Sequence, residues 1–170
     1  MGCLTRDRQK GRRGLLITFE GVEGSGKSTQ CARLAKLLRK EGYRVLETRE
    51  PGGTPFAEWI RALLLARASQ LASETVAPLT EAYLIMATRS QHVAYLIKPA
   101  LEGGAIVICD RFIDSTLAYQ GYGRGLDVQT LLSLNRFATG GLKPNLTLLF
   151  DVPISTGLTR RRREQGMELN

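Results

Sequence analysis

The chain has 170 residues, of which 43% are hydrophobic and 24% charged, a composition typical of one globular domain and unlike that of disordered or fibrous proteins. No apolar run approaches the 18 or so residues that a membrane span needs. The net charge is +8, but residues 1–14 carry five basic residues and one acidic residue, and residues 160–170 carry four and two. Because the body between them is nearly balanced, neither a nucleic-acid nor a membrane partner is expected.

The three cysteines, Cys3, Cys31 and Cys109, are odd in number and show no C-x-x-C spacing. This count argues against a disulfide framework or a zinc site and favours a reducing compartment, the cytoplasm. Residues 1–14 are polar and basic and are interpreted as a flexible leader.

From residue 15 onward, strand patterns alternate with helix patterns. Hydrophobic periodicity, caps and breakers predict strands at 15–19, 44–47, 105–109 and 146–150, and helices at 27–41, 55–65, 80–97, 127–139 and 155–165. A polar Gly-rich stretch with a short helix is predicted over 111–125. Thr54 is expected to cap the second helix and Pro99 to end the third. This alternation predicts an α/β fold with a parallel sheet and helices on both faces. Trp59 is expected to pack in the core or an interface, and His92 to be structural.

The first strand runs into a phosphate-binding motif. Residues 21–28 (GVEGSGKS) fit G-x-x-x-x-G-K-[ST] between a buried strand and a helix. The glycines allow backbone N–H groups to point at phosphate oxygens, and the helix adds its positive end. The predicted ATP-binding residues are Gly21, Val22, Glu23, Gly24, Ser25, Gly26, Lys27, Ser28 and Thr29. Lys27 supplies a charge for the β- and γ-phosphates, and the Ser28 hydroxyl can ligate Mg²⁺.

A second motif, Asp110-Arg111, ends the third strand. Asp110 stands where a carboxylate would hold Mg²⁺ or its water. Arg111 can grip a second phosphate bidentately, which a phosphotransferase needs and a switch GTPase does not. Arg49 follows the second strand at the same edge, and Arg89 interrupts an otherwise apolar helical face, where a charge needs a partner or a ligand.

These sequence segments resemble those of the thymidylate (dTMP) kinases, and the resemblance to the bacterial type is close. The matching segments are FEGVEGSGKST at 19–29, TREPGGT at 48–54, KPAL at 98–101, DRF at 110–112 and AYQGYGRG at 118–125, and the resemblance extends over about residues 15–165. It implies a P-loop NTPase fold and transfer of the ATP γ-phosphate to dTMP, giving dTDP and ADP, with Mg²⁺ as cofactor. It also implies a homodimer, for which the apolar helices at 56–65 and 80–97 are available.

The resemblance also implies roles for individual residues. Arg49 and Arg111 would grip the acceptor phosphate, Glu23 would meet the 3′-hydroxyl, and Ser28 and Asp110 would support the metal. Arg89 and Gln120 would read thymine, and Tyr119 would favour deoxyribose. The implied dTMP-binding set is Glu23, Arg49, Ile85, Arg89, Arg111, Ser115, Tyr119 and Gln120, and the implied catalytic set is Lys27, Asp110, Arg111, Arg160 and Arg163.

Two features depart from the family pattern. Ile85 stands where the family commonly has an aromatic residue that stacks on thymine. The chain also ends within the basic lid, so residues 15–154 are expected to form the kinase core and 155–170 the start of a truncated lid. The last strand and helix would be missing, and the chain is expected to be weakly active or inactive.

Two other functions fit parts of the pattern. A deoxynucleoside kinase would phosphorylate thymidine rather than dTMP. A nucleotide-binding module without catalysis would bind nucleotide and release no ADP. A GTPase switch is a more distant possibility, because the chain has no N-K-x-D-type string.

Overall fold

Four strands form one parallel sheet in a computed structural model of the chain, which describes residues 13–65 and 75–164. The strands are β1 (Leu15–Gly21), β2 (Val45–Arg49), β3 (Ile106–Asp110) and β4 (Leu146–Phe150), in the order β2-β3-β1-β4. Their carboxyl ends meet at one edge, where Asp110 is in register with both Phe19 and Arg49. The expected parallel α/β sheet is confirmed.

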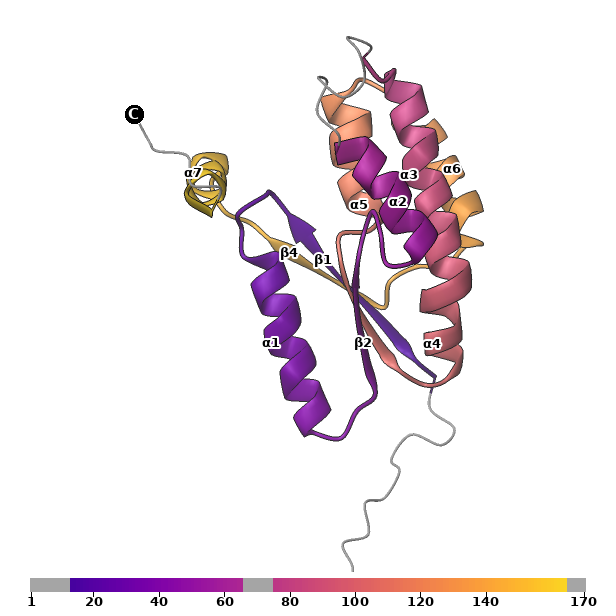
Figure 1. Cartoon of the computed structure of the whole chain (residues 1–170), viewed down its shortest axis with the longest axis vertical. Helices are drawn as coiled ribbons and strands as arrows, with labels where there is room; N and C mark the ends of the chain where they lie inside the picture. The colour runs from indigo at the N-terminus through magenta and orange to yellow at the C-terminus, as the bar shows by residue number, and fades with distance from the viewer. Residues whose placement is uncertain (1–12, 66–74, 165–170) are drawn as a thin grey trace, which may run out of the picture.

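Helices cover both faces of this sheet (Figure 1). Helix α1 (Lys27–Lys40) lies on one face. The opposite face carries α2 (Pro55–Leu65), α3 (Pro78–His92), α4 (Lys98–Glu102), α5 (Ile113–Thr116) and α6 (Val128–Thr139). Helix α7 (Ile154–Glu164) follows β4. Residues 1–12 of the predicted leader and 165–170 of the predicted lid lie outside the described residues.

The sheet separates two apolar clusters, as alternating side-chain direction along each strand requires. Phe19, Ile106 and Ile108 pack with Cys31 and Ala35 of α1. On the other face, Leu16, Val107 and Cys109 pack with Val93, Ile97 and Phe112. Because β1 and β3 are buried on both sides, they show the continuous apolar runs that predicted them.

The long third helix does not end at Pro99. Helix α3 passes through a π-helical turn, η2 (Val93–Ile97), into α4, which contains Pro99 in its first turn. The Lys98 N–H bonds the Val93 carbonyl five residues back. A proline is tolerated in the first turn of a helical segment, where its missing N–H leaves no bond unmade. A second π-helical segment, η3 (Leu117–Gly123), follows α5.

The loop after β2 begins α2 as predicted. The strand runs to Arg49 rather than ending at residue 47. Thr54 caps α2, because its Oγ1 accepts a hydrogen bond from the Ala57 N–H at 3.2 Å. Pro55 occupies the first helical position.

Trp59 does not pack in the core, so that part of its prediction is wrong. Helix α2 buries the face that carries Ala57 and Ile60. Consecutive helical residues point about 100° apart, so Trp59 lies off this face and is 70% exposed. Packing at an interface with another molecule stays a prediction for it.

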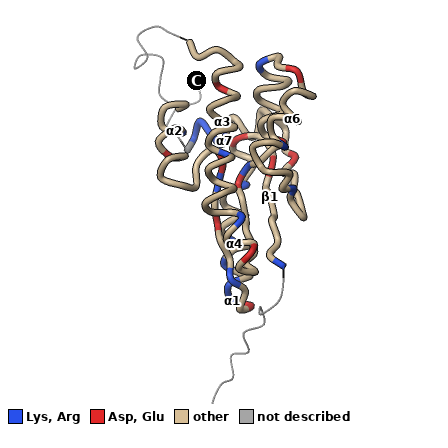
Figure 2. The backbone as a smooth tube through the Cα atoms, turned by 90° about the vertical axis from the view of Figure 1, so that its right-hand side faces the viewer, with Lys and Arg blue, Asp and Glu red and all other residues tan. Residues whose placement is uncertain are grey.

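Charged residues of both signs are interspersed along the described chain in the view of Figure 2. Among the described residues, every helix is too short or too polar to cross a membrane.

Candidate active site

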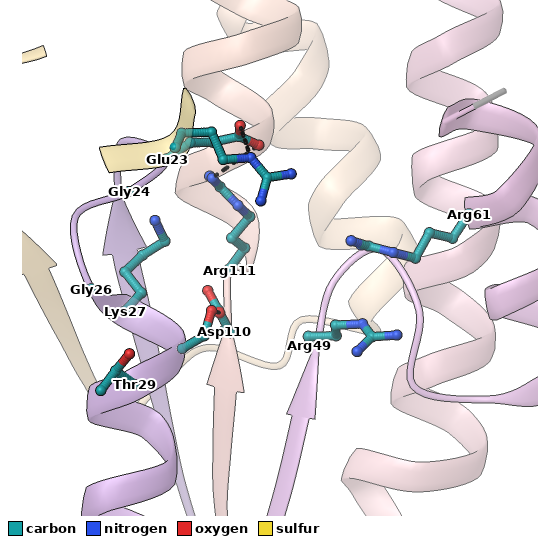
Figure 3. Close-up of a pocket in the computed structure, with 11 residues that line it drawn as sticks. Glu23, Gly24, Gly26, Lys27, Thr29, Arg49, Arg61, Asp110 and Arg111 are labelled. Atoms are coloured by element: carbon teal, nitrogen blue, oxygen red, sulfur yellow. Dashed lines mark hydrogen bonds and ion pairs between the residues drawn. The ribbon is translucent and has the colours of Figure 1, made fainter. Parts of the chain in front are cut away.

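A cavity of about 340 Å³ opens at the carboxyl edge of the sheet (Figure 3). Its lining is strongly polar and comes from the loop after β1, the start of α1 and the ends of β2 and β3, together with α2 and α7. The lining residues are Glu23, Gly24, Gly26, Lys27, Ser28, Thr29, Arg49, Arg61, Asp110, Arg111 and Arg161. The structure therefore brings together most of the predicted phosphate-binding residues.

Two glycines shape the loop between β1 and α1. Gly26 precedes α1 with φ +93°, and Gly24 has φ +70°. A Cβ at Gly24 would lie 2.1 Å from the Gly157 carbonyl oxygen of α7, and a Cβ at Gly157 would lie 2.4 Å from the Glu23 carbonyl oxygen. The close approach of two chain segments, as well as the turn itself, therefore requires glycine here.

Lys27 begins α1 and is buried at the base of the cavity. Its Nζ donates to the Val22 carbonyl oxygen at 2.6 Å and to Ser25 Oγ at 3.3 Å. Burial lowers the pKa of Lys27, and the nearby Arg111 guanidinium lowers it further. An anion entering the cavity would offset both effects, because it would favour the charged ammonium.

Ser28 and Asp110 meet across the sheet edge. The Ser28 hydroxyl donates to Asp110 Oδ2 at 2.5 Å. The other carboxylate oxygen, Oδ1, is buried and has no hydrogen-bond partner among the residues that the structure describes. A buried carboxylate oxygen without a partner needs a further donor or a cation. The Ser28 hydroxyl and the Asp110 carboxylate are oxygen ligands of the kind that fit Mg²⁺. This ion takes one or two protein carboxylates and keeps waters and phosphate oxygens as its other ligands.

Arg111 lies in the left-handed region, with φ +71°. Its Nη1 donates to the Gly21 carbonyl oxygen at 3.4 Å and to Ser115 Oγ at 3.1 Å. Its guanidinium also lies 5.2 Å from the centre of the Tyr119 ring and 3.9 Å from Glu23 Oε1. These contacts aim the side chain back over the phosphate loop rather than out into solvent (Figure 3).

The opposite wall carries two more arginines, Arg49 and Arg61 (Figure 3). Arg49 Nη2 bonds Glu58 Oε2 at 3.0 Å, and Arg61 Nη1 bonds the Pro51 carbonyl oxygen at 2.8 Å. Sequence reasoning missed Arg61. The signal available was its place as the sole cation of an otherwise mostly apolar α2, the same signal that singled out Arg89.

Helix α7 brings Arg161 to the cavity, where its Nε lies 3.5 Å from Glu23 Oε2. The predicted catalytic residues Arg160 and Arg163 are not among the lining residues. Because consecutive residues of a helix point about 100° apart, only part of an arginine run can face one cavity. The assignment of Arg160 and Arg163 stays a prediction.

The other residues of the implied dTMP-binding set lie outside the cavity lining: Ile85, Arg89, Ser115, Tyr119 and Gln120. Gln120 Nε2 donates to Glu81 Oε1 at 2.7 Å, and Tyr119 is partly exposed beside Arg111. Ile85 is half-buried on α3. Ser115 bonds Arg111 as described. Their contacts with dTMP stay predictions.

Arg89 is 2% exposed, and protein groups surround its guanidinium. Its Nε donates to Glu50 Oε2 at 2.6 Å, Nη2 to the Phe112 carbonyl oxygen at 3.0 Å, and Nη1 to Thr116 Oγ1 at 3.0 Å and to Asn135 Oδ1. The charge on the apolar face is therefore satisfied within the protein. Its predicted bond to thymine would have to compete with this network.

Glu20, the last residue but one of β1, is a further buried carboxylate that sequence reasoning missed. Its Oε1 accepts from the Phe112 N–H at 2.7 Å and its Oε2 from the Ser115 hydroxyl at 2.6 Å. Glu20 thus holds Phe112 and Ser115, which follow Arg111 in the chain. Burial raises the pKa of Glu20 above 4.5, although the two hydrogen bonds act in the opposite direction.

This raised pKa predicts a pH-dependent stability difference between the wild type and Glu20→Gln. The folded state binds a proton at Glu20 more tightly than the unfolded chain does, so the wild type should lose unfolding free energy relative to the variant as the pH rises from about 4.5 through the raised pKa. Urea unfolding of both proteins at a series of pH values measures this difference. A difference that stays constant with pH would contradict the prediction.

The loop after β1, its lysine and the parallel sheet together place the protein among the P-loop NTPases, the class that holds a nucleotide's phosphates at a helix amino terminus. Comparison with known proteins narrows the class. The family profile described as Thymidylate kinase matches residues 19–169. The chain belongs to the thymidylate kinase family.

Individual relatives agree with this assignment. The chain is 60% identical over 146 residues to a thymidylate kinase of Thermomicrobium roseum, covering 86% of this chain and 67% of the relative. It is 54% identical over 147 residues to that of Pseudomonas putida, covering 86% and 68%. The crystal structure of thymidylate kinase from Ehrlichia chaffeensis superposes with a TM-score of 0.76 at 41% identity, covering 91% of this chain and 85% of the other.

Proposed function

We propose that the chain transfers the γ-phosphate of ATP to dTMP, giving dTDP and ADP. The observation that carries this proposal is the double set of cations in one cavity. Lys27 and the phosphate loop lie on one side, Arg49 and Arg61 lie on the other, and Arg111 extends over the loop between them. One triphosphate needs only the first set. The second set is needed only when a second anionic group, such as an acceptor phosphate, is held against the first. Membership in the thymidylate kinase family supports dTMP as that acceptor.

In this reaction the chain acts mainly by positioning and by neutralising charge. Lys27 would bind the β- and γ-phosphate oxygens, and Arg111 would approach both the acceptor phosphate and the equatorial oxygens of the transferred group. An ionised oxygen of the acceptor phosphate is the nucleophile, so no general base is required. Glu23 would orient the sugar 3′-hydroxyl. We place the activity in the cytoplasm, as the cysteine pattern favours.

Mg²⁺ belongs to the proposal as cofactor. Asp110 and Ser28 would hold it directly or through water, because Asp110 Oδ1 is a buried oxygen that no described residue of the chain bonds. When bound, the ion would neutralise charge between the β- and γ-phosphates.

The test is ADP release by the purified chain with ATP, Mg²⁺ and dTMP, with dUMP, dCMP and thymidine as alternative acceptors. Turnover specific for dTMP is the expected result. Phosphorylation of thymidine but not of dTMP would select a deoxynucleoside kinase instead. Nucleotide binding without ADP release in the presence of any of these acceptors would select a binding module.

We further propose that the protein forms a homodimer through α2 and α3. These helices pack side by side (Figure 1) and expose large apolar side chains, including Trp59, Phe56 and Tyr83. Contiguous exposed apolar side chains mark interaction surfaces. Trp59→Glu should therefore halve the mass measured by light scattering, whereas Leu37→Glu, at an exposed position of α1 on the other face of the sheet, should leave it unchanged. A monomeric wild type would refute this proposal.

A further inference from the structure

His92 is the sole histidine of the chain and is fully buried on α3. Its Nδ1 lies 3.0 Å from Glu50 Oε1, and its Nε2 lies 2.7 Å from Thr48 Oγ1. One imidazole ring thus contacts the residues on either side of Arg49. The burial and the two bonds fit the expected structural role of His92, and the position of the ring beside Arg49 suggests a further one.

The hydrogen-bond pattern specifies which ring nitrogen carries the proton. The second oxygen of Glu50 accepts from Arg89 Nε at 2.6 Å, so both carboxylate oxygens act as acceptors. The ring must therefore donate from Nδ1. In a neutral imidazole Nε2 is then an acceptor, and the Thr48 hydroxyl donates to it. Neutral histidine with both nitrogens bonded in this way is locked in one tautomer and one orientation.

The loop that follows Arg49 lies directly against this ring. A Cβ at Gly53 would lie 2.4 Å from His92 Nε2 and 2.7 Å from Thr48 Oγ1. From the other side, Glu58 accepts from the Gly53 N–H at 3.0 Å and from Arg49 Nη2 at 3.0 Å. His92 thus bonds the side chains of both chain neighbours of Arg49, and Glu58 bonds the Arg49 guanidinium.

The same hydrogen-bond network extends to the residue that follows Arg111, another arginine of the cavity. Arg89, which is bonded to Glu50, donates through Nη2 to the carbonyl oxygen of Phe112 at 3.0 Å. Phe112 directly follows Arg111 in the chain. The chain of bonds thus runs from the half-buried Thr48 through the buried His92, Glu50 and Arg89 to Phe112, and links the chain neighbours of Arg49 to that of Arg111.

We propose that His92 is a positioning residue for the acceptor phosphate, holding Arg49 toward the cavity through its bonds to Thr48 and Glu50. This inference rests on the proposed function, because the acceptor phosphate is the group that Arg49 would bind. A displacement of about 1 Å in a group that binds the reacting phosphate is enough to change catalysis by about 100-fold. The phosphate loop makes no bond to His92 among the described contacts, so ATP binding should be insensitive to it.

The first test determines which ring nitrogen of His92 carries a proton. Because the chain has one histidine, ring ¹⁵N NMR of the untagged protein gives a single set of imidazole signals without assignment. We expect the signals of a ring that carries a proton on Nδ1, as the bond to Glu50 requires. A proton on Nε2 alone, or a ring that exchanges freely with solvent, would overturn the proposed geometry.

The second test separates positioning from packing. Thr48→Val removes the hydroxyl that bonds His92 Nε2, whereas Thr48→Ser keeps a hydroxyl there. Calorimetry with dTMP and with ATP separately should show dTMP binding weakened about tenfold in Thr48→Val, the order expected for one lost hydrogen bond. ATP binding should change less than about twofold, and Thr48→Ser should restore dTMP binding.

The matched control is Thr139→Val. It removes a buried hydroxyl that bonds only the Arg136 carbonyl of its own helix among the described contacts. It should lower stability comparably without changing dTMP affinity. If Thr48→Val binds dTMP as the wild type does, or loses dTMP and ATP affinity equally, His92 is not a positioning residue. If the wild type itself fails to bind dTMP, the proposed function is overturned together with this inference.

Discussion

Replacing Lys27 with methionine should reduce turnover with ATP and dTMP by about 10²–10³-fold, the range found when one preorganised charge or donor is removed from a transition state. Methionine keeps most of the length of the buried side chain but has no charge for the β- and γ-phosphates. ADP release under saturating dTMP measures the effect. Lys36→Met, at an exposed position of the same helix, is the matched control and should retain wild-type turnover.

Lys27→Met should not lower the thermal unfolding midpoint. The pKa of Lys27 is lowered by burial, so the folded state disfavours its ammonium form relative to the unfolded chain. Removing that charge removes an unfavourable interaction of the nucleotide-free protein. A variant that lost turnover through misfolding would melt earlier and lose dTMP binding as well. That result would contradict the predicted stability and would assign the lost turnover to unfolding rather than to the missing charge.

Arg111→Ala should weaken dTMP binding by about 10–100-fold, as expected for the loss of charge-assisted hydrogen bonds to a phosphate. Calorimetry with dTMP alone measures this without requiring turnover. Arg33→Ala removes an exposed arginine of α1 outside the cavity and should leave dTMP affinity unchanged. Retention of wild-type affinity in Arg111→Ala would exclude Arg111 from the acceptor site.

The backbone at position 111 allows the binding effect to be separated from stability. Because Arg111 has φ +71°, a non-glycine residue there is strained by about 1 kcal/mol. Arg111→Gly should therefore be more stable than Arg111→Ala by about that amount, while both variants lose dTMP affinity equally. Equal stability of the two variants would show that the surroundings do not impose this conformation.

Features that depend on local sequence were predictable. The glycine spacing at 21–28 predicted the phosphate loop, because positive backbone angles at Gly24 and Gly26 are accessible mainly to glycine. The apolar runs of β1 and β3 predicted buried parallel strands. Pro99 was misread, because a π-helical turn before it lets the helix resume with proline in an allowed position.

The partners of the charged residues could not be predicted in the same way. Arg89 carried the right signal, a cation on an apolar face, but the sequence left open whether a ligand or the protein satisfies it. In the structure, Glu50 from the loop after β2, Thr116 from α5 and Asn135 from α6 surround it. Arg61 carried a similar signal and faces the cavity instead.

The sequence by itself determined the order of strands and helices, the phosphate loop and the family, because each depends on short-range spacing or on matched strings. Only the tertiary structure decided which polar groups meet. Ser28 and Asp110 are 82 residues apart and His92 and Glu50 are 42 apart, and their contacts exist because parallel strands end at one edge and α3 packs beneath the loop of β2. The contacts follow from packing, which no local pattern specifies.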